Sequence, residues 1–302
     1  MPARTCPVFH VDTFTRQRFS GNPAVAVLAA DELTGEEMHR LANELHRGDT
    51  VFVTRPEARE HDLKLRFFTP TREVPFIGHC TIAAHYALGC NGEERPKRVR
   101  QETGAGVIDV EVRGQDEERT VAMTLSAPTL GRVLDERERA QVLDALGLGT
   151  GELDTACPMQ IAFKGGSRLL IGLKSVRRLD AMKPELAVLK PLSLHLGADG
   201  FFVFAREGAT EGCLTESRMF CPAIGIDEDP VSGNAHGMLA VYFHAHGILG
   251  ATAGRARFQG LQGRALGRLG RVDIELNVAG VNIASVTVAG QAVLVYRTTV
   301  SL

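Results

Sequence analysis

Apolar positions along the chain switch between a strand-like and a helix-like pattern. Short runs rich in β-branched and aromatic residues, such as Val8–Phe14, predict strands. Helical spacing marks residues 34–45 instead, and this segment opens with a capping box. Two further helices, Cys80–Leu88 and Ala235–His246, are apolar on nearly every side. Because a helix without a polar face has to be covered by other structure, we expect both to be enclosed.

The other predicted elements are mostly strands. Two more helices are expected at Asp135–Leu146 and Pro184–Leu189. The further predicted strands are Pro23–Leu28, Thr50–Thr54, Asp62–Phe68, Val99–Gln101, Gly106–Val112, Thr120–Leu125, Met159–Phe163, Arg168–Leu173, Phe201–Ala205, Ser217–Cys221, Ala256–Gln259, Val272–Leu276, Ala284–Val288 and Ala292–Thr298. This mixture predicts an α+β protein.

The two halves of the chain can be aligned with each other. Residues 66–70, Arg-Phe-Phe-Thr-Pro, match residues 218–222, Arg-Met-Phe-Cys-Pro. Gly78-His79, at the head of the first apolar helix, matches Gly233-Asn234 at the head of the second. These matches lie 152 and 155 positions apart, about half the chain length. We therefore predict two similar domains, 1–126 and 127–302, each a curved sheet around a central apolar helix; the last strand can return to the first domain.

An acidic, glycine-rich turn precedes the second apolar helix. Residues 225–237 read Gly-Ile-Asp-Glu-Asp-Pro-Val-Ser-Gly-Asn-Ala-His-Gly, and Ser232 or Asn234 can cap the first helical turn. Free N–H groups at a helix start favour negative charge, so this place can hold the carboxylates or an anionic ligand. If the two copies face each other, both helix starts can point into one cleft. Their N–H donors would then hold a carboxylate or enolate oxygen while acidic and imidazole side chains move protons.

Composition narrows the classes of function. The formal net charge of −2 provides no basic field for nucleic acid or anionic lipid, and the absence of Trp argues against a base-stacking surface. No apolar run approaches the length of a membrane span, and the N-terminal segment lacks the apolar core of a signal peptide. The six cysteines are scattered without a C-x-x-C pair. We therefore expect a cytoplasmic protein with free thiols and no nucleic-acid or membrane partner.

Several short motifs, in order along the whole chain, carry a family resemblance. They are Val11-Asp12-Thr13-Phe14, Gly21-Asn22-Pro23-Ala24, Ala42-Asn43-Glu44, Phe68-Thr69-Pro70, Gly78-His79, the acidic segment Glu228–Ala235 and the late segment Gln262–Arg268. Together they resemble the PhzF family, the phenazine-biosynthesis isomerase-like group. The resemblance implies the diaminopimelate-epimerase-like fold, with two similar α/β domains, an active-site cleft between them and assembly as a homodimer.

The resemblance also implies an activity. Characterised members of the family move protons on a small carboxylated substrate without a cofactor or a metal. The family's acid/base glutamate maps to Glu44, its histidine to His79 and the aspartate of its acidic motif to Asp229. The residues expected to bind the substrate are Gly78, Cys80, Gly233 and Asn234. The sequence therefore predicts a cofactor-independent isomerase or epimerase that works by general acid/base catalysis.

Asn234 departs from the pattern of the phenazine enzymes. Its position is often serine there, and an amide can hydrogen-bond a substrate but cannot pass a proton as a hydroxyl can. This predicts a member of the broad, uncharacterised bacterial branch. It also leaves open that the protein has kept the scaffold but lost the chemistry, and serves as a binding module for a small ligand or for another protein. Asp227 and Glu228 are expected to be solvated loop charges, although an exchange of roles with Asp229 stays open.

Three other groups of residues suggest chemistry. Cys80 and Cys221 invite comparison with two-thiol racemases, but neither stands in the sequence context of those enzymes. The histidines at positions 236, 244 and 246 share one helix without the spacing of a metal site, so we expect them to be structural. The glycine- and arginine-rich run at 260–270 has no phosphate-binding pattern and is expected to be a loop; a basic contact with the substrate carboxylate or a dimer partner stays open.

Overall fold

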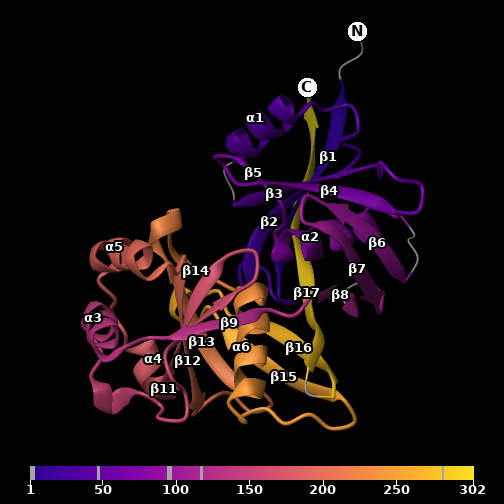
Figure 1. Ribbon diagram of the computed structural model, residues 1–302. Coiled ribbons are helices and arrows are strands. Elements are labelled where there is room, and N and C mark those ends of the chain that lie inside the picture. Colours follow the sequence, from indigo (N-terminus) through magenta and orange to yellow (C-terminus); the bar gives the residue numbers. More distant parts are fainter. Residues whose placement is uncertain (1–3, 46–47, 94–96, 116–117, 281) are drawn as a thin grey trace. The chain divides into compact units, whose positions relative to one another are not determined.

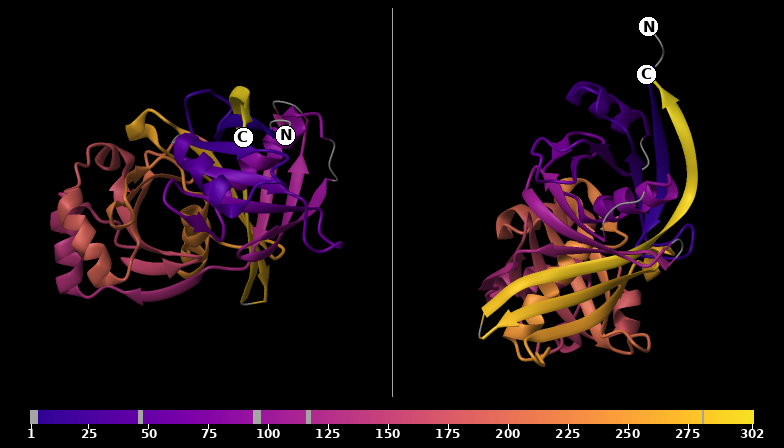
Figure 2. Two further views of the ribbon diagram at one scale, coloured as in Figure 1. Left: turned by 90° about the horizontal axis from the view of Figure 1, so that it is seen from above. Right: turned by 90° about the vertical axis from the view of Figure 1, so that its right-hand side faces the viewer.

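The computed structural model describes residues 4–45, 48–93, 97–115, 118–280 and 282–302. The chain forms two compact units, one with the residues up to Leu125 together with Ala289–Leu302, the other with Ser126–Val288 (Figure 1). Both units combine strands with a few helices, so the fold is α+β as predicted. The last strand, β17 (Asn282–Ser301), contributes residues to both units (Figure 2).

In the first unit, strands surround one apolar helix. α2 (Gly78–Cys90) packs against β1, β2, β3 and β8, and residues 80–88 are all buried. Its enclosure confirms the prediction made from its missing polar face. The sheet pairs β1 antiparallel with β2 and with the end of β17, β2 parallel with β3, and β3 antiparallel with β4. The strands are β1 (Thr5–Thr13), β2 (Asn22–Val27), β3 (Asp49–Thr54), β4 (Leu63–Phe68), β5 (Glu73–Val74), β6 (Arg98–Thr103), β7 (Gly106–Arg113) and β8 (Thr120–Leu125).

α1 (Gly35–Leu45) covers part of this sheet. The predicted capping box is present: Glu37 N–H donates to Thr34 Oγ1 at 3.2 Å, and Glu37 Oε2 accepts from Thr34 N–H at 2.8 Å. Met38, Leu41 and Ala42 are buried in one apolar cluster with residues of β1, β2, β3 and β4. The helical spacing of these residues therefore gave the buried face correctly.

The second unit is likewise built around an apolar helix. α6 (Gly233–Ala245) packs against β9, β10 and β16, and its residues 235–243 are all buried. Shorter helices α3, α4 and α5 complete this unit, with β11 and β12 in the same apolar core (Figure 1). The elements are β9 (Thr129–Val133), α3 (Glu136–Leu146), β10 (Gln160–Phe163), β11 (Ser167–Ser175), α4 (Val176–Asp180), α5 (Leu186–Leu196), β12 (Gly200–Glu207), β13 (Thr215–Cys221), β14 (Ile226–Asp229), β15 (Arg255–Gln262), η4 (Arg264–Leu266) and β16 (Gly270–Ala279).

The strand pairing of one unit is repeated in the other. β4 pairs antiparallel with β3 and β5 and parallel with β6, and β13 pairs antiparallel with β12 and β14 and parallel with β15. A bidentate ion pair is repeated as well. Arg66 Nε and Nη2 donate to the Glu73 carboxylate at 2.8 Å each, and Arg218 Nε and Nη2 donate to the Glu228 carboxylate at 2.9 and 2.8 Å. The sequence match between 66–70 and 218–222 thus has a counterpart in three dimensions.

Some predicted elements differ in extent from the structure. The separate strands expected at Ala284–Val288 and Ala292–Thr298 are one continuous strand, β17. Gly290 makes no turn between them; a Cβ at Gly290 would lie 2.4 Å from the Phe14 ring, so the glycine permits close packing. The helix expected at Pro184–Leu189 is α5, which starts at Leu186 and continues past Pro191 to Leu196. None of the helices in the described parts of the chain has the length and apolarity needed to cross a membrane.

Candidate active site

Three chemically active side chains meet at the start of α2 in the first unit. Asp49 is the first residue of β3, the strand on which α2 packs, while His79 and Cys80 lie in the first turn of α2. His79 Nε2 is 3.6 Å from Asp49 Oδ2, and the donor atoms of all three residues lie within 4.8 Å of one another. The contact of β3 with α2 therefore brings a carboxyl group and an imidazole together.

Partial burial changes the acidity of Asp49. Its side chain is 25% exposed, and that of His79 is 14% exposed. Loss of water around the carboxylate raises the pKa of Asp49 from its ordinary 3.8 to about 6. A carboxyl group with a pKa near the working pH can both accept and return a proton, which is the property of a general acid/base. The distance of 3.6 Å between His79 Nε2 and Asp49 Oδ2 is longer than a hydrogen bond, so the two groups do not form one with each other.

Cys80 does not share this reactivity. Its side chain is completely buried, and burial raises the pKa of the thiol well above its usual value. Nucleophilic attack needs the thiolate, which burial disfavours here. Aspartate, histidine and cysteine are ligand types that zinc accepts. The expected absence of a metal and a cofactor stays a prediction.

The first turn of α2 presents backbone donors. Ile77, the residue before the helix, is extended with φ −136°, and no side chain among the described residues caps this end. Helix-start N–H groups carry partial positive charge and attract anions. A Cβ added at Gly78 would have its nearest neighbours at 3.8 and 3.9 Å, which is ordinary contact. Packing thus does not require glycine at this position.

Glu44 is not one of the three residues whose donor atoms cluster at the start of α2. It is exposed near the C-terminal end of α1, whereas Asp49 shares the cluster with His79. The sequence reasoning missed Asp49, although the duplication contains a signal for it. Asp49 opens β3 as Gly200 opens β12, so the first copy has a carboxylate where the second has no side chain. Asn234 similarly occupies the position of His79, so this pair of titratable groups belongs to one copy.

In the second unit, the predicted residues lie along one short stretch. Asp229 is the last residue of β14, and its carbonyl accepts a hydrogen bond from Gln262 Nε2 at 2.7 Å. Ser232, one of the two expected caps, accepts from Ala235 N–H at 3.2 Å, and Gly233 begins α6. Asn234 Nδ2 donates to the carbonyl of Lys164 at 2.7 Å, so this amide is held by the backbone next to β10.

The acidic turn is less solvated than expected. Asp227 is exposed, as predicted, but Glu228 is only 11% exposed and is held by Arg218. The expectation that Glu228 is a solvated loop charge was therefore wrong, because the sequence alone does not show the ion pair across β13 and β14. Arg264 lies in the run at 260–270, for which the sequence left a contact with the substrate carboxylate open. Its Nε and Nη2 donate to the Glu216 carboxylate at 2.8 and 2.9 Å, so its guanidinium is already paired.

Two other candidates are structural. Cys221 is completely buried, and burial raises its pKa to about 12, so a second reactive thiol is not supported. His236 is completely buried with Nδ1 2.8 Å from the carbonyl of Ser232, and burial lowers its pKa to about 4. It is therefore a neutral core histidine at neutral pH, as its position on an apolar helix predicts.

Comparison with known proteins gives a consistent result. Residues 11–298 match the family model described as phenazine biosynthesis-like protein. An uncharacterised isomerase of Clostridium acetobutylicum is 37% identical over 96% of each chain, and the trans-2,3-dihydro-3-hydroxyanthranilate isomerase of Pseudomonas aeruginosa is 31% identical over 93% of this chain and 94% of its own. A PhzF-family crystal structure from Bacillus anthracis superposes with a TM-score of 0.88 at 27% identity, covering 99% of this chain and 100% of its own. A hydroxyproline epimerase from Agrobacterium vitis shares the fold, with a TM-score of 0.65 at 13% identity over 99% of this chain and 93% of its own.

Proposed function

Because the chain belongs to the phenazine biosynthesis-like (PhzF) family, whose relatives are named isomerases, we propose a cofactor-independent isomerase or epimerase that moves a proton at carbon. Its substrate is a small carboxylated molecule. The observation that carries the proposal is the partly buried Asp49 carboxyl beside His79, with a pKa of about 6. Such a group is ionised often enough to take a proton from carbon and is protonated often enough to return it.

The start of α2 supplies the proposed anchor for the substrate. The uncapped N–H groups around Gly78 and Cys80 would hold the substrate carboxylate or the enolate oxygen that develops when the neighbouring C–H bond breaks. The relative from Pseudomonas aeruginosa is named for a hydroxyanthranilate, which is a cyclic carboxylate. Cyclic and amino-acid carboxylates are therefore the first substrates to test.

The proposed reaction conserves every proton. The ionised base takes a proton from carbon, the electron pair of that C–H bond delocalises into the substrate, and the protonated group returns the proton to another position or face. His79 assists from a position in which its Nε2 lies 3.6 Å from Asp49 Oδ2, and Asp229 and Asn234 are proposed substrate contacts, as the family resemblance implies. The family resemblance assigns the base to Glu44, whereas burial, the raised pKa and the neighbouring imidazole all favour Asp49.

The test is solvent exchange at carbon. The protein is incubated in heavy water with a panel of cyclic and amino-acid carboxylates, and deuterium uptake is followed by mass spectrometry. We expect uptake into at least one compound, at a rate that H79N lowers by tenfold or more, because a general acid/base group typically contributes about 10²- to 10⁴-fold. Uptake in none of the panel, together with measurable binding of a panel member, would instead support a binding module, the alternative suggested by Asn234.

Assembly and location complete the proposal. We expect a cytoplasmic homodimer, as the family resemblance implies. Light scattering after size-exclusion chromatography measures the mass directly, and one chain weighs 32.6 kDa. A mass that equals one chain at all working concentrations would contradict the homodimer without affecting the proposed chemistry.

A further inference from the structure

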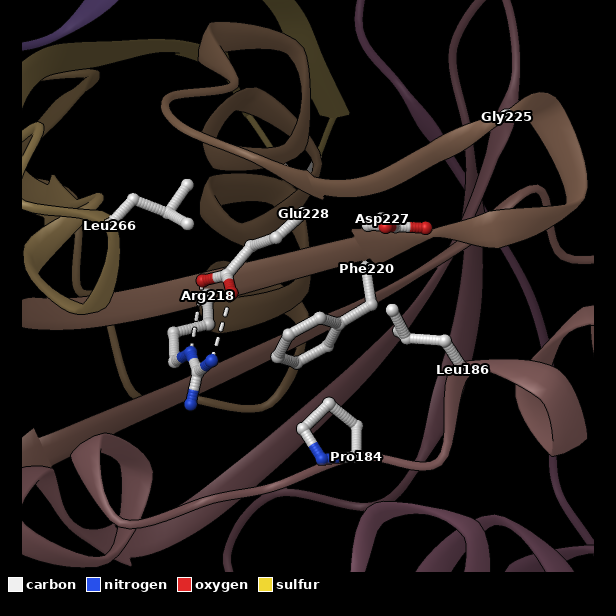
Figure 3. A pocket seen from close by; sticks show the side chains of 8 residues that line it. All are labelled: Pro184, Leu186, Arg218, Phe220, Gly225, Asp227, Glu228 and Leu266. Atoms are coloured by element: carbon white, nitrogen blue, oxygen red, sulfur yellow. Dashed lines mark hydrogen bonds and ion pairs between the residues drawn. The ribbon is translucent and has the colours of Figure 1, made fainter.

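A pocket opens in the second unit beside the acidic turn. Its volume is about 480 Å³, which is in the range of sites for small molecules. The walls are mostly apolar: Pro184 and Leu186 line one side, Phe220 the floor and Leu266 the other side (Figure 3). The residues of the proposed reaction do not line it.

Two of the three charged residues that line this pocket are paired with each other. Arg218 and Glu228 form the bidentate pair, and their side chains are 10% and 11% exposed. Arg218 Nη1 also donates to the carbonyls of Leu179 and Met182, and its guanidinium carbon lies 4.9 Å from the centre of the Phe220 ring. The two charges of the pair thus neutralise each other in the pocket wall, and the arginine is not available to a ligand anion.

Asp227 carries the charge that remains. Its carboxylate is exposed at the pocket, and no described residue forms a hydrogen bond or an ion pair with it (Figure 3). β14 pairs with β13 at Ile226–Cys221 and at Asp229–Met219, and the register shifts by a bulge between these two pairs, so Asp227 lies on the bulged part of the strand. The lining residues together carry a net charge of one negative unit, beside apolar walls.

The other copy of the fold provides an internal comparison. The Arg66–Glu73 pair repeats the Arg218–Glu228 pair, so Arg72 occupies the position of Asp227. The ion pair is therefore a feature of the shared scaffold. The free carboxylate belongs to the second copy alone. Its charge is negative, whereas Arg72 at the same position of the first copy is positive.

We propose that this pocket binds a small organic ammonium compound with an apolar body, whose cation meets Asp227 and whose body lies against Leu186, Phe220 and Leu266. An anion is disfavoured because the one uncommitted charge is negative. This site is independent of the proposed isomerase reaction, since it uses none of the groups assigned to proton transfer.

The experiment uses three probes that share a phenyl ring and carry a cationic, a neutral or an anionic terminal group. Phenethylamine, 2-phenylethanol and phenylacetate are titrated at neutral pH into the full-length ¹⁵N-labelled protein, and the amide signals of Gly225, Asp227 and Leu266 report on the pocket. D227N removes the proposed contact at a surface position. D109N makes the same change at an exposed carboxylate of β7, in the first unit. L266A shortens one apolar wall.

We expect the amine to bind about 3- to 5-fold more tightly than the alcohol, the range of one solvent-exposed ion pair, and phenylacetate to leave the pocket amides unshifted. D227N should abolish the preference for the amine but keep binding of the alcohol, D109N should change neither, and L266A should weaken both without altering their ratio. Amine selectivity that survives in D227N, pocket shifts caused by phenylacetate, or amine-induced shifts confined to other residues would each overturn the proposal. Shifts by phenylacetate near Gly78 report on the active site and leave this test unaffected.

Discussion

Replacing Asp49 by asparagine should make the protein more stable at neutral pH while removing its proposed base. The ionised carboxylate is held in a site that disfavours charge, as its raised pKa indicates. The shift from 3.8 to about 6 corresponds to an upper limit of about 3 kcal/mol, at about 1.4 kcal/mol per pKa unit. Because the side chain is still 25% exposed, water offsets part of this cost, and we expect about 1–2 kcal/mol.

The dependence on pH gives this prediction its sign. Below the unfolded pKa of 3.8 the carboxyl is neutral in both states and costs nothing. As the pH rises toward 6 the unfolded chain loses its proton first, so wild type loses stability relative to D49N, and above 6 the difference is constant. The stabilisation by D49N should therefore be larger by roughly 1–2 kcal/mol at about pH 7.5 than at about pH 3, below the unfolded pKa.

Urea denaturation followed by circular dichroism measures this difference at both pH values. Comparing the two conditions cancels any packing effect of the asparagine that is independent of pH. E44Q is the matched control, because it neutralises an exposed carboxylate of α1 and should change the free energy of unfolding by less than about 0.5 kcal/mol at either pH. A D49N effect that is equal at the two pH values, or larger in acid, would refute the reasoning about burial of Asp49.

Three further predictions concern other parts of the structure. G78A should change the free energy of unfolding by less than about 0.5 kcal/mol, since a Cβ fits there, yet it should slow deuterium uptake at least tenfold by crowding the proposed anchor. A loss of stability that accompanies the slower uptake would point to a folding defect instead. The pKa of His236 is lowered from 6.5 to about 4, so wild type should lose up to about 3 kcal/mol of its free energy of unfolding as the pH falls through that range. Urea titration of H236Q should show no such loss. R218M should cost about 3 kcal/mol by leaving its carboxylate partner buried, whereas R66M, whose pair is 26% and 45% exposed, should cost less than about 1 kcal/mol; similar melting temperatures for the two would contradict this.

The apolar helices and most of the strands could be predicted from the sequence. The missing polar faces of α2 and α6 indicated their enclosure, and the capping box at Thr34 and Glu37 marked the start of α1. Local patterns are informative in these cases because both signals, a helix without a polar face and a capping box, lie within a few turns of one helix. Gly290 shows the limit: the sequence suggested two separate strands on either side of it, but β17 is continuous and the glycine allows close contact with Phe14, a residue far away in the chain.

The candidate site was harder to predict for the same reason. The sequence drew attention to His79 through the match between the two helix starts. Asp49 carries no local sign of its role, because its raised pKa arises from burial at the contact of β3 with α2. The ion pair of Glu228 with Arg218 also depends on strand pairing across β13 and β14, so a carboxylate that looks solvated in the sequence is buried in the structure.

The central claim is that Asp49, next to His79, carries the proton. The most direct test is the rate of deuterium uptake in heavy water, measured side by side for wild type, D49N and E44Q with the same compound. We predict that D49N lowers the rate by a factor of about a hundred or more, within the usual contribution of a general base, and that E44Q stays within about twofold of wild type. The opposite pattern, with an active D49N and an inactive E44Q, would contradict the account and return the proton carrier to Glu44.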